Sequence, residues 1–494
     1  MLERTDFMDR NHLPLNITEK LRARTSFIGS VIVLIVLSLT LCFADYSLIE
    51  KPARDAANQA ARAERQAQKE ASENYVKSAH VVAAGNNVFD TNIYQAGISD
   101  TGVWNYDFLY DHVREKIQSA DLAIVSQSTP LTQDHNAVVG YPTYRSPAEA
   151  ADALINAGFD IIASASCHAD DYGAAGITET LNVWNSKYPN IPILGIHSSA
   201  ESANTAQIVT VNDIRIALLN YTYGTSTSSL SSEEAFMLDT FDKDKIAQAV
   251  SSAKSQSDCV IFIAHWGETD ETAPSEYQKQ WATYLMNLGV NVIIGTHPMT
   301  VQPYGTMTDD LGNETTVFYS LGHFAAIEEV SSRLVGGIAD FTIEKEVKNG
   351  ESSIRISNRS LEPLVMHYNY SSGEYGPYLL DDYTDALAGE HSMTSLGYSI
   401  SLSGLQEQFD TIMSANVTPT TDLSLVNSAS DGTADSDAAD TVTDVYEQSS
   451  DTTSGITYDA NGGYYDSGGN YYDAYGNVYT SNGYYDAYGN FYSY

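Results

Sequence analysis

Short apolar runs alternate with amphipathic segments through the middle of this chain, from His80 to about His391. An apolar run bounded by turn residues is typical of a buried strand, and apolar positions three or four residues apart are typical of a helix. The runs predict strands at His80–Ala84, Leu122–Val125, Asp160–Ala165, Ile208–Val211, Ile214–Asn220, Cys259–Ala264, Val290–Ile294, Thr316–Tyr319 and Ile338–Ile343. The amphipathic segments predict helices at Phe108–Ser119, Pro147–Ala157, Ala174–Lys187, Asp242–Lys254 and Ser275–Leu288. This alternation predicts an α/β domain, and the adjacent runs around Asn212-Asp213 predict a hairpin and therefore a mixed sheet.

A longer apolar run, Thr25–Ala44, precedes the alternating region and carries no charged residue. About 20 apolar residues span the core of a bilayer as a helix. Basic residues between positions 20 and 24 precede the run, and a positive flank stays on the cytoplasmic side. We therefore expect a cytoplasmic segment at 1–24, a single-pass anchor in the cell membrane at 25–44, and an extracellular main domain. A cleaved signal peptide is the alternative, because Cys42-Phe43-Ala44 has a small-x-small pattern.

Composition divides the rest of the chain into further segments. Residues 45–78 are rich in Ala, Arg, Glu, Gln and Lys, which predicts a solvated helical stalk. Residues 79–400 carry the alternation and form the main domain. Residues 401–455 are an acidic segment dominated by Ser, Thr and Asp, which predicts a disordered linker.

The tail at 456–494 consists mostly of Tyr, Gly, Asn and Asp. The repeats YYDSGGN, YYDAYGN and YYDAYGN begin at Tyr464, Tyr471 and Tyr484. With almost no aliphatic side chains, such repeats cannot build an ordinary core. Two interpretations stay open: the rings stack on sugars or another cell-wall polymer, or the tail is a self-associating low-complexity segment.

The charge balance narrows the classes of partner. The 494 residues carry a formal net charge of −39 at pH 7, and Arg359 is the last Lys or Arg. This sign argues against nucleic acid as a partner and against electrostatic binding to an anionic membrane surface. Three cysteines do not make a disulfide framework.

Three histidines follow or end apolar runs, which makes them the candidates for chemistry. IIASASCH ends at His168, CVIFIAHWG contains His265, and VIIGTHP contains His297. Open α/β sheets build their sites at the carboxyl ends of strands. We therefore predict one polar site to which all three side chains contribute.

Longer motifs between His80 and His391 accompany these histidines. They are GYPTYRSPAEAADALINAGFDII, IRIALLNYTYG, HWGET, PSEYQKQWA, VNVIIGTHP, VQP, YSLGHF and DDYTDALAGEH. Together they resemble the capsule-synthesis CapA family. The resemblance implies a calcineurin-like metallophosphoesterase fold, a layered α/β sandwich with mixed sheets and a metal site at the strand ends. It also implies a role with an anionic surface polymer such as poly-γ-glutamate, with membrane-bound polymer synthase components and the polymer as partners.

Part of the family's site pattern is retained. Its Asn-His, followed by Asp three residues after the His, corresponds to Cys167-His168 with Asp171. Its His-Trp-Gly is intact at His265, and the first His of its His-Pro-His is His297. The resemblance implies His168, His265 and His297 as metal ligands, and as the catalytic residues if the site is active. Asp171 would orient His168 or cap the helix that follows.

Other positions of the pattern have changed. The family's Gly-Asp corresponds to Gly85-Asn86, and Ser126 and Ser128 replace the Asn and Glu of its Asn-x-Glu-Thr. Met299 replaces the second His of His-Pro-His, and His323 replaces the Asn of Leu-Gly-Asn-Phe. Losing two carboxylates removes about two negative charges that a hard cation needs. These changes predict a pseudoenzyme, an inactive relative of the metal-dependent phosphoesterases.

The same changes also permit a rewired metal site. Cys167, Met299 and His323 add sulfur and nitrogen donors to the three histidines, and such a set suits zinc or copper(I) better than magnesium or manganese. The cofactor prediction is therefore either none or one divalent metal, zinc or manganese.

Together these features predict a membrane-anchored extracellular protein that takes part in biosynthesis or retention of a capsule or surface polymer without catalysis. Two alternatives stay open. One is a metal-dependent hydrolase with an altered ligand set, and the other is a surface protein that binds the cell wall through its Tyr-rich tail.

Overall fold

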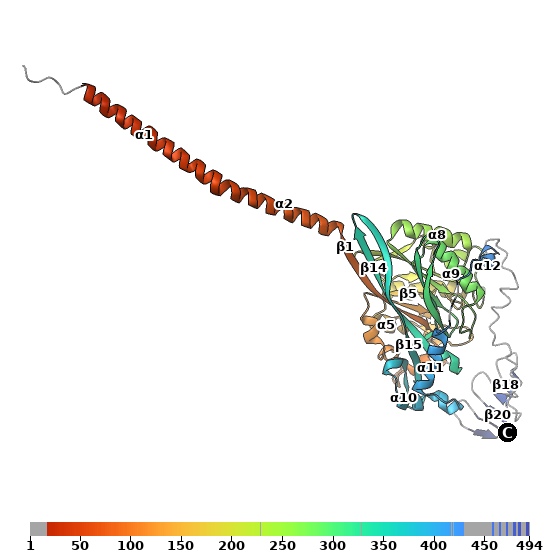
Figure 1. The fold of residues 1–494 in the computed structure, drawn as a ribbon. Helices are drawn as coiled ribbons and strands as arrows, with labels where there is room; N and C mark the ends of the chain where they lie inside the picture. The colour runs from red at the N-terminus through yellow and green to blue at the C-terminus, as the bar shows by residue number, and fades with distance from the viewer. Residues whose placement is uncertain are drawn as a thin grey trace, which may run out of the picture. The chain divides into compact units, whose positions relative to one another are not determined.

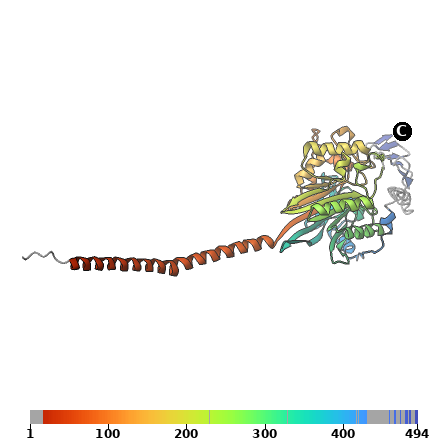
Figure 2. The ribbon, with the colours of Figure 1, turned by 90° about the horizontal axis from the view of Figure 1, so that it is seen from above.

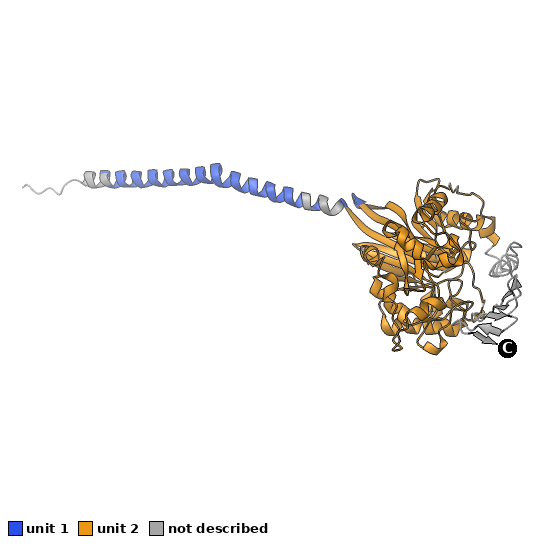
Figure 3. Cartoon of the chain, turned by 90° about the horizontal axis from the view of Figure 1, so that it is seen from below, with its two compact units in different colours: residues 1–75, 347–351 blue, residues 76–346, 352–494 orange. Residues whose placement is uncertain are grey.

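The computed structural model describes residues 17–227, 229–327, 329–415, 417 and 419–428, together with short strands between 457 and 493. The chain divides into two compact units (Figure 3). The first unit is Met1–Tyr75 with Val347–Glu351, and the second is Val76–Glu346 with Ser352–Tyr494.

The first unit is mainly helical between Ile17 and Glu73 (Figure 1). Helix α1 (Ile17–Asp45) continues through a π-helical turn at Tyr46–Glu50 into α2 (Lys51–Glu73). The described side chains of the apolar run are largely exposed; Leu34, for example, is 66% exposed. This is one helix near the N-terminus that is long and apolar enough to cross a membrane, a test that a signal sequence also passes. The predicted helices at both segments are confirmed.

The second unit contains two large mixed sheets. The first has the strand order β16-β15-β14-β1-β2-β5-β6, with β13 also paired to β1. Its strands are β1 (Tyr75–Asn87), β2 (Leu122–Gln127), β5 (Ile161–Ala163), β6 (Ile193–Leu194), β13 (His323–Ala325), β14 (Val335–Lys348), β15 (Glu351–Asn369) and β16 (Glu374–Leu379). The second has the order β11-β12-β10-β9-β8-β7. Its strands are β7 (Gln207–Val211), β8 (Ile214–Thr222), β9 (Cys259–His265), β10 (Val292–Thr296), β11 (Val301–Thr308) and β12 (Glu314–Leu321).

The two sheets pack face to face because alternate residues of each strand point to opposite sides. In β1, Val81 and Ala83 join an apolar layer that also contains Ile216 and Ile263 of the second sheet. Val82 belongs instead to a core outside the first sheet, which includes side chains of α5. A third core joins the outer face of the second sheet to α8 and α9. The result is a layered α/β sandwich, as expected.

Helices cover the outer faces, and Figures 1 and 2 show them from two directions. They are α5 (Glu149–Ala157), α6 (Gly173–Lys187), α8 (Lys243–Gln256) and α9 (Glu276–Leu288). Each overlaps a predicted helix, and every predicted strand overlaps an observed one. The hairpin is also confirmed: β7 and β8 are antiparallel, and Asn212 and Asp213 both have positive φ, as a tight hairpin turn requires.

The continuous helix predicted at Phe108–Ser119 is wrong. The chain forms a 3₁₀ turn at Asp107–Tyr110 and a separate short helix, α4, at Arg114–Gln118. The Arg114 guanidinium donates to the carbonyl oxygen of Asp107 at 3.0 Å. That carbonyl is the one that a continuous α-helix would bond to residue 111.

The predicted boundaries of two segments also differ. Strand β1 begins at Tyr75, inside the stalk expected at 45–78. The linker expected at 401–455 begins too early, because α11 (Leu402–Met413) buries Leu405 and Phe409 in the apolar layer between the sheets. Short helix α12 (Ser424–Ser428) also buries Val426. Residues 429–455 lie outside the described residues.

The tail contributes short strands, and the first two repeats pair with each other. Strands β17 to β22 form a six-stranded sheet in chain order, and each paired neighbour is antiparallel. The strands are β17 (Thr457–Tyr458), β18 (Tyr464–Tyr465), β19 (Tyr471–Tyr472), β20 (Val478–Thr480), β21 (Gly483–Tyr485) and β22 (Phe491–Ser493). Tyr464 and Tyr472 are register partners, as are Tyr465 and Tyr471.

A second histidine cluster, away from the strand ends considered above, lies in the core near the end of β15. His367 is fully buried, and its Nδ1 lies 2.8 Å from the Tyr383 hydroxyl. The His391 ring is 5.3 Å away between centroids, and its Nε2 lies 3.1 Å from the carbonyl oxygen of Met366. Burial first, and then the neighbouring His391, lower the pKa of His367 to about 4.

This cluster predicts an acid-sensitive fold. Between pH 6.5 and pH 4 the unfolded chain binds a proton at His367 that the folded chain does not, so the free energy of unfolding falls as pH falls through this window. We expect His367→Asn, which keeps an amide near the Nδ1 position, to reduce that pH-dependent loss by roughly 2–3 kcal/mol. Urea unfolding of the full chain in detergent at stepped pH values measures this loss of unfolding free energy.

The matched control is His135→Gln, at an exposed histidine that stacks on Trp104 and lies outside this cluster. The control should retain the pH slope of the unmodified chain. An identical slope in His367→Asn would contradict the assignment.

Candidate functional site

The site lies where the carboxyl ends of parallel strands from both sheets meet. In the first sheet β1 is parallel to β2 and β2 is parallel to β5, while in the second β9 is parallel to β10. Asn86 lies at the end of β1, His265 ends β9, and His297 directly follows β10. Cys167 and His168 lie in the loop after β5. The prediction of one shared polar site at the strand ends therefore matches the geometry.

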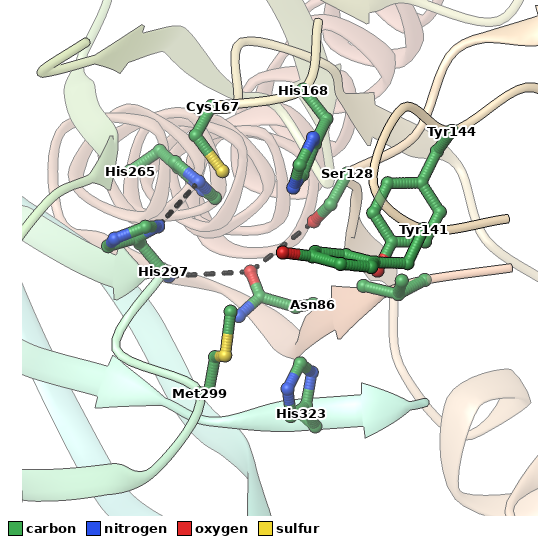
Figure 4. Close-up of a pocket in the computed structure, with 11 residues that line it drawn as sticks. Asn86, Ser128, Tyr141, Tyr144, Cys167, His168, His265, His297, Met299 and His323 are labelled. Atoms are coloured by element: carbon green, nitrogen blue, oxygen red, sulfur yellow. Dashed lines mark hydrogen bonds between the residues drawn. The ribbon is translucent and has the colours of Figure 1, made fainter. Parts of the chain in front are cut away.

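These ends line a pocket with about 480 Å³ of empty space, part of it open to solvent (Figure 4). Its lining residues are Asn86, Val88, Ser128, Tyr141, Tyr144, Cys167, His168, His265, His297, Met299 and His323. None of these lining residues, all in the described part of the chain, is Asp or Glu. The pocket is therefore rich in imidazole and poor in negative charge.

Three of the predicted donors form a compact group. One ligand atom from each of Cys167, His265 and His297 lies within 4.8 Å of the others, and all three residues are buried. His297 Nδ1 is 3.2 Å from His265 Nε2. Figure 4 shows the Cys167 sulfur and the His297 ring on either side of the His265 ring.

A neighbouring hydroxyl contacts each of the two histidine rings at the nitrogen that faces away from the other ring. The far nitrogen of His265, Nδ1, is 3.0 Å from Thr296 Oγ1, and the far nitrogen of His297, Nε2, is 3.1 Å from the Tyr223 hydroxyl. Burial is the main cause that lowers the pKa of His265 to about 4, so this imidazole is neutral at physiological pH. His297 has a φ of 96°, a left-handed conformation that costs a non-glycine residue free energy and must be imposed by the surrounding fold.

His168 belongs to a separate pair with Asp171. Its Nδ1 is 3.0 Å from Asp171 Oδ2, and the same carboxylate oxygen accepts from the Tyr144 backbone at 2.7 Å. Asp171 therefore orients His168, as expected. The capping alternative is wrong, because Tyr172 precedes α6 and no side chain caps that helix.

Cys167 lies between two imidazoles. Burial alone would raise the pKa of its thiol, but the interactions with His168 and His265 outweigh burial and hold that pKa well below its usual range. Cys167 and Asp171 in turn hold the pKa of His168 well above its usual range against burial. Since His265 is neutral, we assign the positive charge beside the thiolate to His168.

Asn86 and Ser128 are the two positions at which the resemblance to the CapA family implies carboxylates. The Asn86 side-chain oxygen accepts from the His297 backbone at 3.4 Å and from the Ser128 hydroxyl at 3.3 Å. A Cβ at Gly85 would lie 2.1 Å from the carbonyl oxygen of Gly322, so the close approach of these two backbones requires glycine before Asn86. Ser126 is buried in β2, but it does not line the pocket.

Met299 and His323 line another wall of the pocket. Met299 has a φ of 67°, and His323 is the register partner of Asn86 in the pairing of β13 with β1. His323 does not belong to the group of three donors, so the set of nitrogen and sulfur donors expected from the sequence is only partly assembled.

Several residues that line the pocket or contact its lining were not identified from the sequence. Tyr141 and Tyr144 come from a loop in the motif GYPTYRSP, and nothing in their spacing shows that the loop returns to the strand ends. Tyr223 could have been found, because it directly follows β8 in the second sheet and the rule that identified the histidines applies equally to it.

The donor chemistry decides what kind of metal the site can hold. A pair of hard cations needs several anionic oxygen ligands, and this lining supplies none. A thiolate with two imidazoles suits one borderline or soft cation. The group can therefore bind a metal, but not through the oxygen donors that the family pattern implies.

Among known proteins, two curated relatives share part of this chain. The PGA biosynthesis protein CapA of Bacillus subtilis (strain 168) is 25% identical over 221 residues, which are 44% of this chain and 56% of that protein. The capsule biosynthesis protein CapA of Bacillus anthracis is 27% identical over 180 residues, 36% of this chain and 42% of that protein. The match thus spans about half the length of these relatives.

Solved structures also match this chain, at lower sequence identity. NAD nucleotidase (NadN) of Haemophilus influenzae matches with 13% identity and a TM-score of 0.37, over 68% of this chain and 67% of that one. A putative 5'-nucleotidase of Staphylococcus aureus matches with 14% identity and a TM-score of 0.37, over 59% and 55%.

The family comparison covers the strands that build the site. The model of the bacterial capsule synthesis protein PGA_cap matches residues 80–327, which include every residue that lines the pocket. This chain therefore belongs to the PGA_cap family of bacterial capsule synthesis proteins.

Proposed function

We propose that this protein is an outward-facing, membrane-anchored component of the machinery that makes, exports or retains an anionic surface polymer of the poly-γ-glutamate type, and that it does not hydrolyse phosphoesters. Family membership and the names of the two CapA relatives support the polymer. The observation that carries the noncatalytic role is the pocket lining, which lacks carboxylates.

Electrostatics explains why this lining matters. Two divalent cations bring four positive charges, and burying uncompensated charge costs several kcal/mol per ion. At the family's carboxylate positions, Asn86 and Ser128 contribute only neutral oxygens. A pocket that does not hold a pair of hard cations cannot use them to activate water. We infer that the main domain binds and positions its partners, namely membrane-bound synthase components or the polymer itself.

Restoring one carboxylate tests this inference. In Asn86→Asp the new carboxylate oxygen can accept the same hydrogen bonds from Ser128 and the His297 backbone, so the fold should tolerate it. We expect the affinity of the full chain for Mn²⁺ to rise at least tenfold, measured by calorimetry in detergent.

The control Asn358→Asp adds the same charge at an exposed position and should leave Mn²⁺ affinity unchanged. The unmodified chain should show no Mn²⁺- or Mg²⁺-dependent phosphoesterase turnover. Turnover that disappears in both His265→Ala and His297→Ala would overturn the noncatalytic role.

The apolar helix supports the membrane part of the proposal. Its described side chains between residues 24 and 45 are mostly exposed apolar groups, which a bilayer would cover. We expect the full chain to stay with membranes after an alkaline carbonate wash, and protease added to intact cells to digest the main domain. Release by the wash, or full protection from protease, would contradict an outward-facing anchored protein.

The tail supports a second candidate function, attachment to a neutral cell-wall glycan. Its strands pair with their neighbours in the chain, so tyrosines are register partners in this sheet. The tail has no Lys or Arg, which disfavours capture of an anionic polymer by charge, while aromatic rings stack on sugars.

Sedimentation with purified cell walls tests the tail. Deleting residues 456–494 from the full chain should lower the bound fraction about tenfold, since stacking of several rings adds a few kcal/mol. Deleting residues 429–455 instead removes a shorter segment without the Tyr-rich repeats and should leave binding intact. Equal binding by both deletion variants and the full chain would reject attachment through the tail.

A further inference from the structure

The group formed by Cys167, His265 and His297 already has the spacing of a metal site. At zinc–nitrogen distances of about 2.0–2.1 Å, two tetrahedral nitrogen ligands lie roughly 3.3 Å apart. His265 Nε2 and His297 Nδ1 are 3.2 Å apart. With the Cys167 donor inside the same 4.8 Å group, little movement is needed to surround one ion.

The rings are also oriented for this role. A ligating histidine usually hydrogen-bonds through its other nitrogen, which fixes the tautomer and the ring plane. Thr296 Oγ1 faces His265 Nδ1 at 3.0 Å, and the Tyr223 hydroxyl faces His297 Nε2 at 3.1 Å. Both hydroxyl oxygens can accept a hydrogen bond from these ring nitrogens. The other two nitrogens, His265 Nε2 and His297 Nδ1, can then direct their lone pairs toward an ion.

The donor types select the ion. One thiolate and two neutral imidazoles supply a single negative charge and no oxygen, a set that favours zinc over magnesium, calcium or manganese. The group contributes three donors, and all three residues also line the pocket. A fourth coordination position would therefore face the pocket, as in zinc sites that keep one position for water or a ligand.

We propose that Cys167, His265 and His297 bind one Zn²⁺ ion, with a fourth coordination position open to the pocket. The donors come from loops or strand ends of both sheets, so the ion also ties the two sheets together at this edge. This proposal does not depend on the polymer or on the membrane anchor.

Cobalt substitution provides a direct test. The full chain in detergent, stripped of metal, is titrated with Co²⁺ and separately with Zn²⁺. We expect one equivalent of Co²⁺ to bind, with a sulfur-to-cobalt charge-transfer absorption in the near ultraviolet, and Zn²⁺ to displace it. Cys167→Ser should abolish that absorption and weaken Zn²⁺ binding at least about 100-fold, because a ligand change should exceed the 10–100-fold effect of an outer contact.

Matched variants separate ligation from folding. Cys259→Ala replaces the other buried cysteine, which lies in β9 and outside the group, and should keep the absorption. Tyr223→Phe removes only the hydroxyl behind His297 and should weaken Zn²⁺ binding about tenfold while the absorption stays. Thermal unfolding without metal identifies any variant that fails to fold, and His297→Gln then replaces Cys167→Ser as the ligand variant.

Two results would overturn the site. One is the absence of charge-transfer absorption in the unmodified chain at saturating Co²⁺. The other is an absorption that survives in folded Cys167→Ser. Phosphoesterase turnover would contradict the noncatalytic role but not this site, so the two proposals fail separately.

Discussion

The apolar layer between the two sheets is the constraint on which the rest of the structure depends. Residues such as Val81, Ile216 and Ile263 hold the sheets face to face. With the sheets fixed in this way, the carboxyl ends of parallel strands from both sheets open at one edge. Asn86 and His297, which are 211 positions apart in the chain, then come within hydrogen-bonding distance. The site is thus a consequence of sheet packing rather than of any local sequence motif.

The architecture of this site does not by itself fix its chemistry. The chain carries a net charge of −39, yet no Asp or Glu lines the pocket in the described part of the chain. The Asp171 carboxylate contacts His168 from outside the lining. A fold sets where side chains meet, whereas the side chains decide which ion or partner is accepted. Membership of a capsule synthesis family therefore indicates the fold of this protein. Its pocket, however, carries a donor set that differs from the one that the resemblance implies.

Sequence reasoning succeeded where burial and local pattern coincide. The strands were predictable because their residues are buried on both faces and form continuous apolar runs, as in β9 at Cys259–His265. It failed where long-range or side-chain contacts replace the local signal. Arg114 interrupts a regular helix by taking a backbone carbonyl. Leu405 and Phe409 anchor α11 in a segment whose overall composition is that of a linker, because two buried residues one turn apart hardly change composition.

The sequence by itself determined the α/β class, the apolar N-terminal helix and the placement of His168, His265 and His297 at strand ends, because each depends on residues close together in the chain. Tertiary structure decided which donors meet. It grouped Cys167 with His265 and His297, paired His168 with Asp171, and left Ser126 out of the pocket. It also brought Tyr141 and Tyr144 into the lining. The physical reason is that distances of 3–5 Å between side chains depend on how two sheets and their loops pack, and spacing along one strand carries no information about the other sheet.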